Sequence, residues 1–153
     1  MHFELSIING KTVFDIVHAH FDECIRIVRE AYLAHADRQS VNPDSYFLKF
    51  PDKPDCRIIA LPAYLGNSFD VAGLKWIASY PANVQRGFPR ASAVLVLNSY
   101  ETGYPFAILE SSIISAARTA RVSRSCRALA DRAIVSDALA GNRGHRVHRP
   151  VRL

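Results

Sequence analysis

Apolar residues follow two different patterns along the first 120 residues of the chain, a helical spacing first and short extended runs after it. Between Val13 and Asp37 they return every three or four positions, which predicts one long amphipathic helix. The apolar stripe of this helix is Val17, Phe21, Cys24, Ile25, Val28 and Tyr32. An Asn42-Pro43 pair ends the pattern, because a residue before proline disfavours helical conformation.

Short extended runs follow the helix, and clusters of Pro, Gly and Asp separate them. These predicted strands are Tyr46–Phe50, Arg57–Leu61, Val71–Ser79, Ser92–Asn98 and Phe106–Leu109, with an earlier one at Phe3–Ile8 closed by an Asn9-Gly10 turn. We expect the core to include Ile58, Ile59, Val94, Val96 and Leu97. A helical pattern resumes near Ser111. The whole predicts an α+β domain over residues 1–120, in which one helix covers a mostly antiparallel sheet.

The charge changes abruptly after Ala120. Residues 1–120 are nearly neutral, whereas residues 121–153 hold eight arginines, no lysine and two aspartates. This tail has no aromatic residue, so it lacks the pattern of a nucleic-acid-binding surface. One interpretation of residues 121–153 is a helix with a basic, frayed end. The favoured interpretation is an aberrant tail produced by a reading-frame shift in a GC-rich gene.

Cysteine and histidine positions indicate neither disulfides nor a metal. Cys24, Cys56 and Cys126 are odd in number and far apart, as is usual in a reducing cytoplasm. His18 and His20 point to different sides of the predicted helix, which makes a metal pair there improbable. No apolar run approaches the roughly 18 residues of a membrane span. We therefore expect a cytoplasmic protein with no metal and no membrane partner.

The block from Val71 to Ala120 carries the candidate chemistry. It contains a lysine within an apolar strand, a Pro-x-Asn turn, a Gly-x-Pro turn and the pair Arg118-Thr119 in a helix. The order and spacing of these features resemble the ornithine cyclodeaminase/mu-crystallin family of NAD(P)-dependent amino-acid enzymes. The resemblance covers about residues 1–120. It implies a substrate-binding and dimerisation domain that forms a homodimer, and in the family a dinucleotide-binding domain follows it.

Residues 41–51 and 57–62 resemble one branch of that family in particular. Members of this branch oxidatively cleave N-(2-amino-2-carboxyethyl)-L-glutamate to 2,3-diaminopropionate, a siderophore precursor. The resemblance therefore implies an NAD-dependent amino-acid oxidoreductase. The alternatives are an ornithine cyclodeaminase fragment, which would convert ornithine to proline, and an inactive binding or dimerisation module.

Lys75 and Arg118 are the leading site candidates. A lysine among buried strand residues is costly unless it is paired or functional, although it could also face outward. By resemblance, Lys75 contacts the substrate carboxylate and assists proton transfer. The planar guanidinium of Arg118 suits a carboxylate or a phosphate, and the alternative is a solvated helix residue. By resemblance it contacts both substrate and NAD, and we expect Lys75 and Arg118 to converge on one pocket.

Four weaker candidates complete the predicted site. By resemblance, Arg90 lines the cofactor site, with a plain surface arginine as an equal alternative, and the Thr119 hydroxyl lies near the cofactor. Lys49 occupies the segment where the family usually has a carboxylate-binding arginine, so it would keep the charge and lose the bidentate geometry. Trp76 either walls the pocket or packs in the core.

One signature of the family is missing from the sequence. No Gly-x-Gly-x-x-Gly follows a strand, although that turn forms the phosphate cradle of a dinucleotide-binding fold. Only 33 residues follow Ala120, whereas such a domain needs about 100–200. We therefore expect this chain alone neither to reduce NAD nor to bind it tightly.

Overall fold

The computed structural model describes residues 4–119, and the chain divides into two units between Thr119 and Ala120. The expectations about residues 121–153, including their origin in a frame shift, fall outside the described residues.

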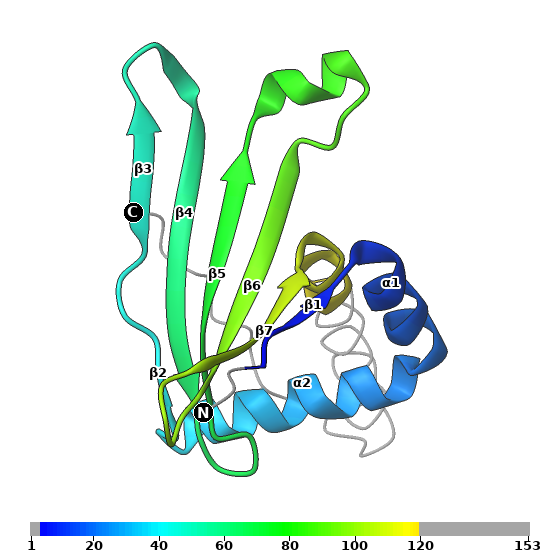
Figure 1. The fold of residues 1–153 in the computed structure, drawn as a ribbon, viewed down its shortest axis with the longest axis vertical. Coiled ribbons are helices and arrows are strands. Elements are labelled where there is room, and N and C mark those ends of the chain that lie inside the picture. The colour runs from blue at the N-terminus through cyan, green and yellow to red at the C-terminus, as the bar shows by residue number, and fades with distance from the viewer. Residues whose placement is uncertain (1–3, 120–153) are drawn as a thin grey trace, which may run out of the picture. The chain divides into compact units, whose positions relative to one another are not determined.

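A seven-stranded mixed sheet is the centre of this unit (Figure 1). The strands are β1 (Ser6–Ile8), β2 (Ser40–Val41), β3 (Tyr46–Phe50), β4 (Lys53–Leu65), β5 (Val71–Ser79), β6 (Ala91–Ser99) and β7 (Pro105–Glu110). They lie in the order β1-β7-β6-β5-β4-β2, with β3 also paired to β4. Every pair is antiparallel except β1 with β7. The α+β fold and the mostly antiparallel sheet are thus confirmed, while β4 is longer than predicted and β2 was missed.

The predicted long helix is in fact two helices, which corrects the sequence analysis. Helix α1 spans Gly10–Ala19 and α2 spans Phe21–Ala36, and His20 between them has the non-helical angles φ −115° and ψ 46°. The acidic residues Asp22 and Glu23 lie in the first turn of α2, where they favour a helix N-terminus. The apolar spacing continues across the break, so periodicity alone could not detect it.

Asn9 begins a helix and does not form the predicted turn. Its side-chain oxygen accepts a hydrogen bond from the backbone N–H of Thr12 at 3.0 Å, so it acts as the N-cap of α1. A cap at this position satisfies one of the unpaired N–H groups of the first helical turn. The helix therefore starts three residues earlier than the apolar pattern indicated.

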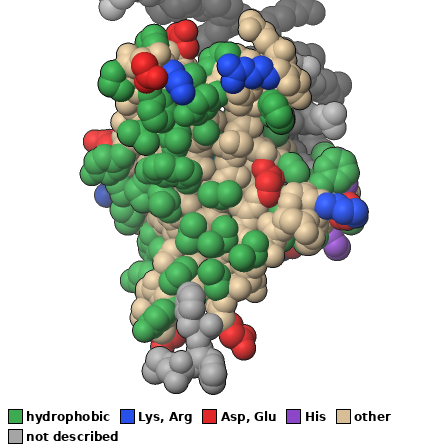
Figure 2. All heavy atoms as spheres, turned by 45° about the horizontal axis from the view of Figure 1, so that its top comes forward, with side chains coloured by type: hydrophobic (Ala, Val, Ile, Leu, Met, Phe, Trp, Pro, Cys, Tyr) green, Lys and Arg blue, Asp and Glu red, His purple; other side chains and the backbone are tan. Residues whose placement is uncertain are grey.

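The two faces of the sheet differ in what covers them. The inner face carries Ala93 and Ala107, which are both 6% exposed, and helix residues from α2 and from the helix that begins at Ser112 lie over it. The outer face carries the alternate residues, among them Trp76 and Val94, which pair across β5 and β6 and are 41% and 42% exposed. Val94 and Trp76 were thus wrongly expected in the core or the pocket wall. Figure 2 shows hydrophobic side chains gathered over the sheet.

A short 3-10 helix, η1 (Pro81–Arg86), connects β5 to β6 at the end of the sheet. Gly87 ends it in the left-handed conformation with φ 75°, and the Asn83 amide donates to the Pro89 carbonyl at 3.4 Å. The proline, asparagine and glycine of this segment therefore shape a loop, as the sequence suggested.

Candidate functional site

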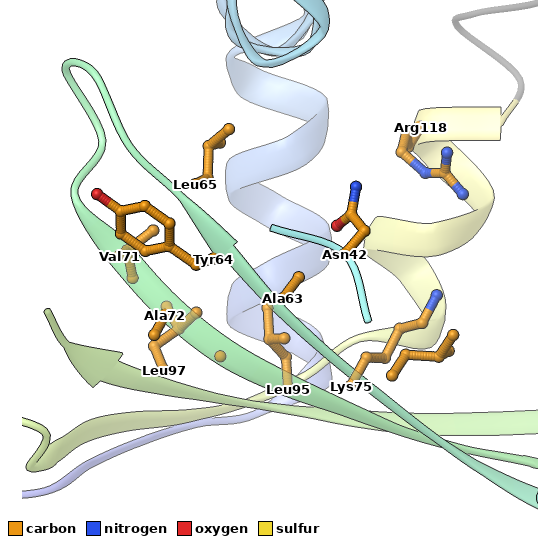
Figure 3. Close-up of a pocket in the computed structure, with 12 residues that line it drawn as sticks. Asn42, Ala63, Tyr64, Leu65, Val71, Ala72, Lys75, Leu95, Leu97 and Arg118 are labelled. Carbon is orange, nitrogen blue, oxygen red and sulfur yellow. The ribbon is translucent and has the colours of Figure 1, made fainter. Parts of the chain in front are cut away.

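A pocket of about 440 Å³ lies on the inner face of the sheet (Figure 3). Its floor comes from the central strands, including Leu61 on β4, Gly73 and Lys75 on β5, and Leu95 on β6. Arg118 reaches it from the helix that begins at Ser112, and Asn42 from the segment after β2. Residues distant in sequence thus contribute their polar groups to one largely apolar hollow.

Lys75 lies in the middle of β5 and is half-buried. Its register partners are Leu61 on β4 and Leu95 on β6, so the stem of the lysine is flanked by aliphatic side chains. Burial lowers the pKa of Lys75 below its usual value, and the positive charge of Arg118 lowers it further. The ammonium is therefore partly dehydrated and close to a like charge, and an anion would relieve both costs.

Arg118 completes the pair of cations. Its guanidinium is exposed, and Nη1 donates a long hydrogen bond of 3.5 Å to the hydroxyl of Tyr32 on α2. Within residues 4–119, no carboxylate forms an ion pair with Lys75 or Arg118. Among the described residues that line the pocket there is no Asp or Glu either. Two uncompensated cations facing one hollow make it suited to a carboxylate or another small anion.

The other predicted site residues do not line this pocket. Lys49 is exposed on β3, opposite Arg57 of β4. Arg90 is exposed just before β6, and its carbonyl accepts from the backbone N–H of Tyr80 at 2.9 Å. Thr119 donates its hydroxyl to the carbonyl of Ser115 at 2.9 Å. The structure therefore brings together Lys75 and Arg118 but not these three, whose roles stay predictions.

Sequence reasoning missed two polar residues at the site. Asn42 lines the pocket, and Tyr32 contacts Arg118 from α2. Asn42 was identified only as part of a helix-breaking pair, and Tyr32 was assigned to the buried stripe although it is 50% exposed. The signal for Asn42 was its place in the 41–51 segment that carried the family resemblance.

Metal-ligating side chains are not clustered in the part of the chain that the structure describes. Residues 4–119 contain no cluster of three metal-ligating side chains, and Cys24 and Cys56 are free thiols. No helix in this range is long and apolar enough to cross a membrane. The glycines with positive φ in this range are Gly87, which ends η1, and Gly103, in the β6–β7 turn, so neither opens a helix N-terminus for a phosphate. Neither of these two glycines therefore belongs to a dinucleotide cradle.

The described residues thus form a sheet covered on one face by helices, with the side chains of Lys75 and Arg118 at a hollow in that face. The sequence model of the ornithine cyclodeaminase/mu-crystallin family matches residues 11–139, and the chain belongs to this family. The match extends beyond Ala120, so the family likeness does not end where the sequence analysis placed its boundary.

Three relatives illustrate the similarity. N-((2S)-2-amino-2-carboxyethyl)-L-glutamate dehydrogenase of Staphylococcus aureus is 36% identical over 127 residues, which cover 80% of this chain and 38% of the relative. Alanine dehydrogenase of Archaeoglobus fulgidus is 38% identical over 98 residues, covering 64% and 29%. The solved structure of an archaeal alanine dehydrogenase dimer with bound NAD superposes with a TM-score of 0.70 at 31% identity, covering 78% and 35%. The chain thus spans about a third of the length of these relatives.

Proposed function

We propose that residues 4–119 form the amino-acid-binding domain of an NAD-dependent oxidoreductase, with Lys75 and Arg118 holding the substrate carboxylate. The observation that carries the proposal is the convergence of these two cations on one apolar hollow without a described counter-ion. The family of the chain and the dehydrogenase names of its relatives support the same class of activity.

Lys75 is the residue to which we assign proton transfer. A lowered pKa makes the Lys75 ammonium a stronger acid, so its proton is transferred more readily than that of a fully solvated lysine. Arg118 remains charged throughout and therefore orients the carboxylate. In the relatives' chemistry NAD would accept the hydride. Arg118, Thr119 and Arg90 stay as proposed contacts to its phosphates, each weak where it is exposed to water.

The charge of the pocket favours an acidic substrate over a diamino acid. A terminal ammonium such as that of ornithine needs a carboxylate partner, and none is among the residues within 4–119 that line the hollow. A substrate with several carboxylates would instead be attracted by Lys75 and Arg118. This supports a substrate similar to N-(2-amino-2-carboxyethyl)-L-glutamate, the compound named for the Staphylococcus aureus relative, over ornithine.

Calorimetric titration of the purified chain with L-glutamate and L-ornithine tests the proposal. We expect glutamate to bind more tightly. Lys75→Met and Arg118→Met should each weaken glutamate binding by tenfold or more, since hydrogen bonds to charged groups contribute about 1.5–3 kcal/mol. Lys53→Met, which removes an exposed lysine at the start of β4, is the matched control and should leave binding unchanged. Lys49→Met tests the predicted role of Lys49, because a loss of glutamate affinity in this variant would support its binding of a carboxylate. Binding of glutamate that survives both pocket substitutions would rule out the site.

We also infer that a second copy of the chain covers the outer face of the sheet. Trp76, Val94 and Phe106 lie on that face and are each more than 40% exposed, and Tyr46 and Leu48 of β3 extend it. Contiguous exposed apolar areas of this kind usually mark an interface. The solved archaeal relative is described as a dimer, which supports self-association as the reason for the exposure.

Analytical ultracentrifugation checks this inference. Trp76→Glu and Phe106→Glu should shift the protein from dimer to monomer, because each places a charge in an apolar contact. Val84→Glu alters an equally apolar residue on η1, away from the sheet face, and should leave the dimer intact. A wild-type chain that sediments as a monomer at micromolar concentration would contradict the inference.

A further inference from the structure

A second hollow of about 400 Å³ adjoins the pocket of Lys75 on the side of helix α2. The two hollows share Asn42, Ala63, Tyr64, Leu65 and Arg118 along their common wall. Beyond that wall, the second hollow is lined by residues of α2 and by Ser40 of β2. Arg118 therefore borders both hollows, and a ligand whose carboxylate it holds can extend from one into the other.

The far side of this second hollow carries a polar pair. His35, in the last turn of α2, has its Nδ1 atom 2.7 Å from the hydroxyl oxygen of Ser40. The break at Asp37 and the short strand β2 bring these two residues together. Neither His35 nor Ser40 belongs to the proposed carboxylate-binding site at Lys75 and Arg118, and the sequence pattern did not indicate either residue.

The His35–Ser40 pair always has a hydrogen-bond donor left for a ligand. If the serine hydroxyl donates to Nδ1, the proton of the neutral ring resides on Nε2 and is available. If Nδ1 donates to the serine oxygen, the hydroxyl proton is available instead. A protonated ring would offer both. In every case the pair can donate to a carboxylate.

The charges around the second hollow also favour an anionic ligand group. Its described lining residues include Arg118, His35, Ser40, Asn42 and Tyr32, and none of those described is an Asp or Glu. A cationic ligand group would find no counter-ion there, whereas an anionic group would find donors on two sides. The apolar residues Val28, Ala31 and Leu65 suit the methylene groups that would lead to it.

From this arrangement we propose that the second hollow is the side-chain subsite of the amino-acid pocket, and that His35 and Ser40 select substrates with a second carboxylate. The proposal rests on the proposed function, because Lys75 and Arg118 must hold the first carboxylate. It adds the residues that would distinguish an acidic amino acid from an apolar one of the same length.

The test compares L-glutamate with L-norvaline, which has the same chain length but no second carboxylate. Both are titrated calorimetrically into the wild-type chain and the variants His35→Leu and Ser40→Ala. We expect the wild type to prefer glutamate, and each variant to lose about tenfold or more of its glutamate affinity with norvaline affinity unchanged. His18→Leu on α1, which removes an exposed histidine outside both hollows, should keep the wild-type preference. Unchanged melting temperatures would show that the variants fold.

The outcomes separate this proposal from the one on which it rests. If Lys75→Met abolishes binding of both amino acids but His35→Leu and Ser40→Ala bind glutamate as the wild type does, the subsite assignment is wrong and the carboxylate site stands. If His35→Leu and Ser40→Ala weaken glutamate and norvaline equally, these residues support the fold and do not select the substrate. If neither amino acid binds the wild type, both proposals fail.

Discussion

Replacing Lys75 by methionine should make the domain more stable while it removes amino-acid binding. The side chain of Lys75 is half-buried, with its stem flanked by Leu61 and Leu95, and the pKa of its ammonium is lowered by burial and by Arg118. Methionine has nearly the same length and requires no hydration. The apolar contacts of the lysine stem are kept, so the gain comes from removing the desolvation and the repulsion of the charge, which is roughly 1 kcal/mol for a half-buried group. For a domain of this size that is roughly 2–8 °C in melting temperature.

The pH dependence of this gain has a defined sign. Since the folded domain binds the Lys75 proton less tightly than the unfolded chain, protonated Lys75 opposes folding. That cost is fully present below the lowered pKa and disappears as the pH rises past the ordinary lysine value of about 10.4. The stability advantage of Lys75→Met should therefore be largest at neutral pH and shrink in alkaline buffer.

Differential scanning calorimetry at pH 7 and at a pH near 9.5 measures both effects. Lys53→Met removes an exposed lysine and should change the melting temperature little at either pH. If Lys75→Met melts at or below the wild-type temperature at pH 7, the lysine is well solvated or well paired. The account of the site as a partly dehydrated cation pair would then be wrong.

Two further predictions concern the pocket floor and the cofactor. Gly73→Ala should destabilise the domain by about 1–3 kcal/mol, because the added Cβ would lie 2.8 Å from the carbonyl oxygen of Val96. Urea unfolding measures this loss, and a value below about 0.5 kcal/mol would show that β5 and β6 can separate freely. The chain alone should show no micromolar affinity for NAD in calorimetry and no NADH formation with amino acids, since hydride transfer needs a placed nicotinamide; tight binding or steady turnover would contradict this.

Two of the strands could be predicted closely because their apolar runs are bounded by clear turn residues, whereas β4 extends beyond the predicted run at both ends. Val71–Ser79 and Tyr46–Phe50 agree with β5 and β3 to the residue. The helices were harder, since the break at His20 preserves the apolar spacing and Asn9 was interpreted as a turn when it is a cap. Strand β2 has two residues and depends on its pairing with Tyr64 and Leu65, a long-range contact that no local pattern encodes.

The polar residues of the site also differ in whether the sequence alone could identify them. Lys75 is conspicuous in sequence because it interrupts an apolar strand, and the alternation of that strand also determines that Trp76 must face the opposite side. Whether the lysine faced the helices or the open side could not be decided from one strand, because both faces of this sheet are apolar. The packing of α2 and β2 over the inner face is what brings three further residues to the two hollows, and no local sequence pattern indicates it. These residues are Asn42, Tyr32 and His35.

The apolar character of both faces has a functional consequence. A monomeric domain needs only one apolar face on its sheet, and here the inner face already supplies the buried residues and the pocket. The outer face therefore contributes no lining residue to the pocket, and the proposed association would account for the exposure of Trp76 and Phe106. Because β5 bears Lys75 on one side and Trp76 on the other, a partner seated on the outer face would stiffen the strand that positions the lysine. Weakened glutamate affinity in a Trp76→Glu monomer that retains its fold would reveal this coupling, since Trp76 itself does not line the pocket.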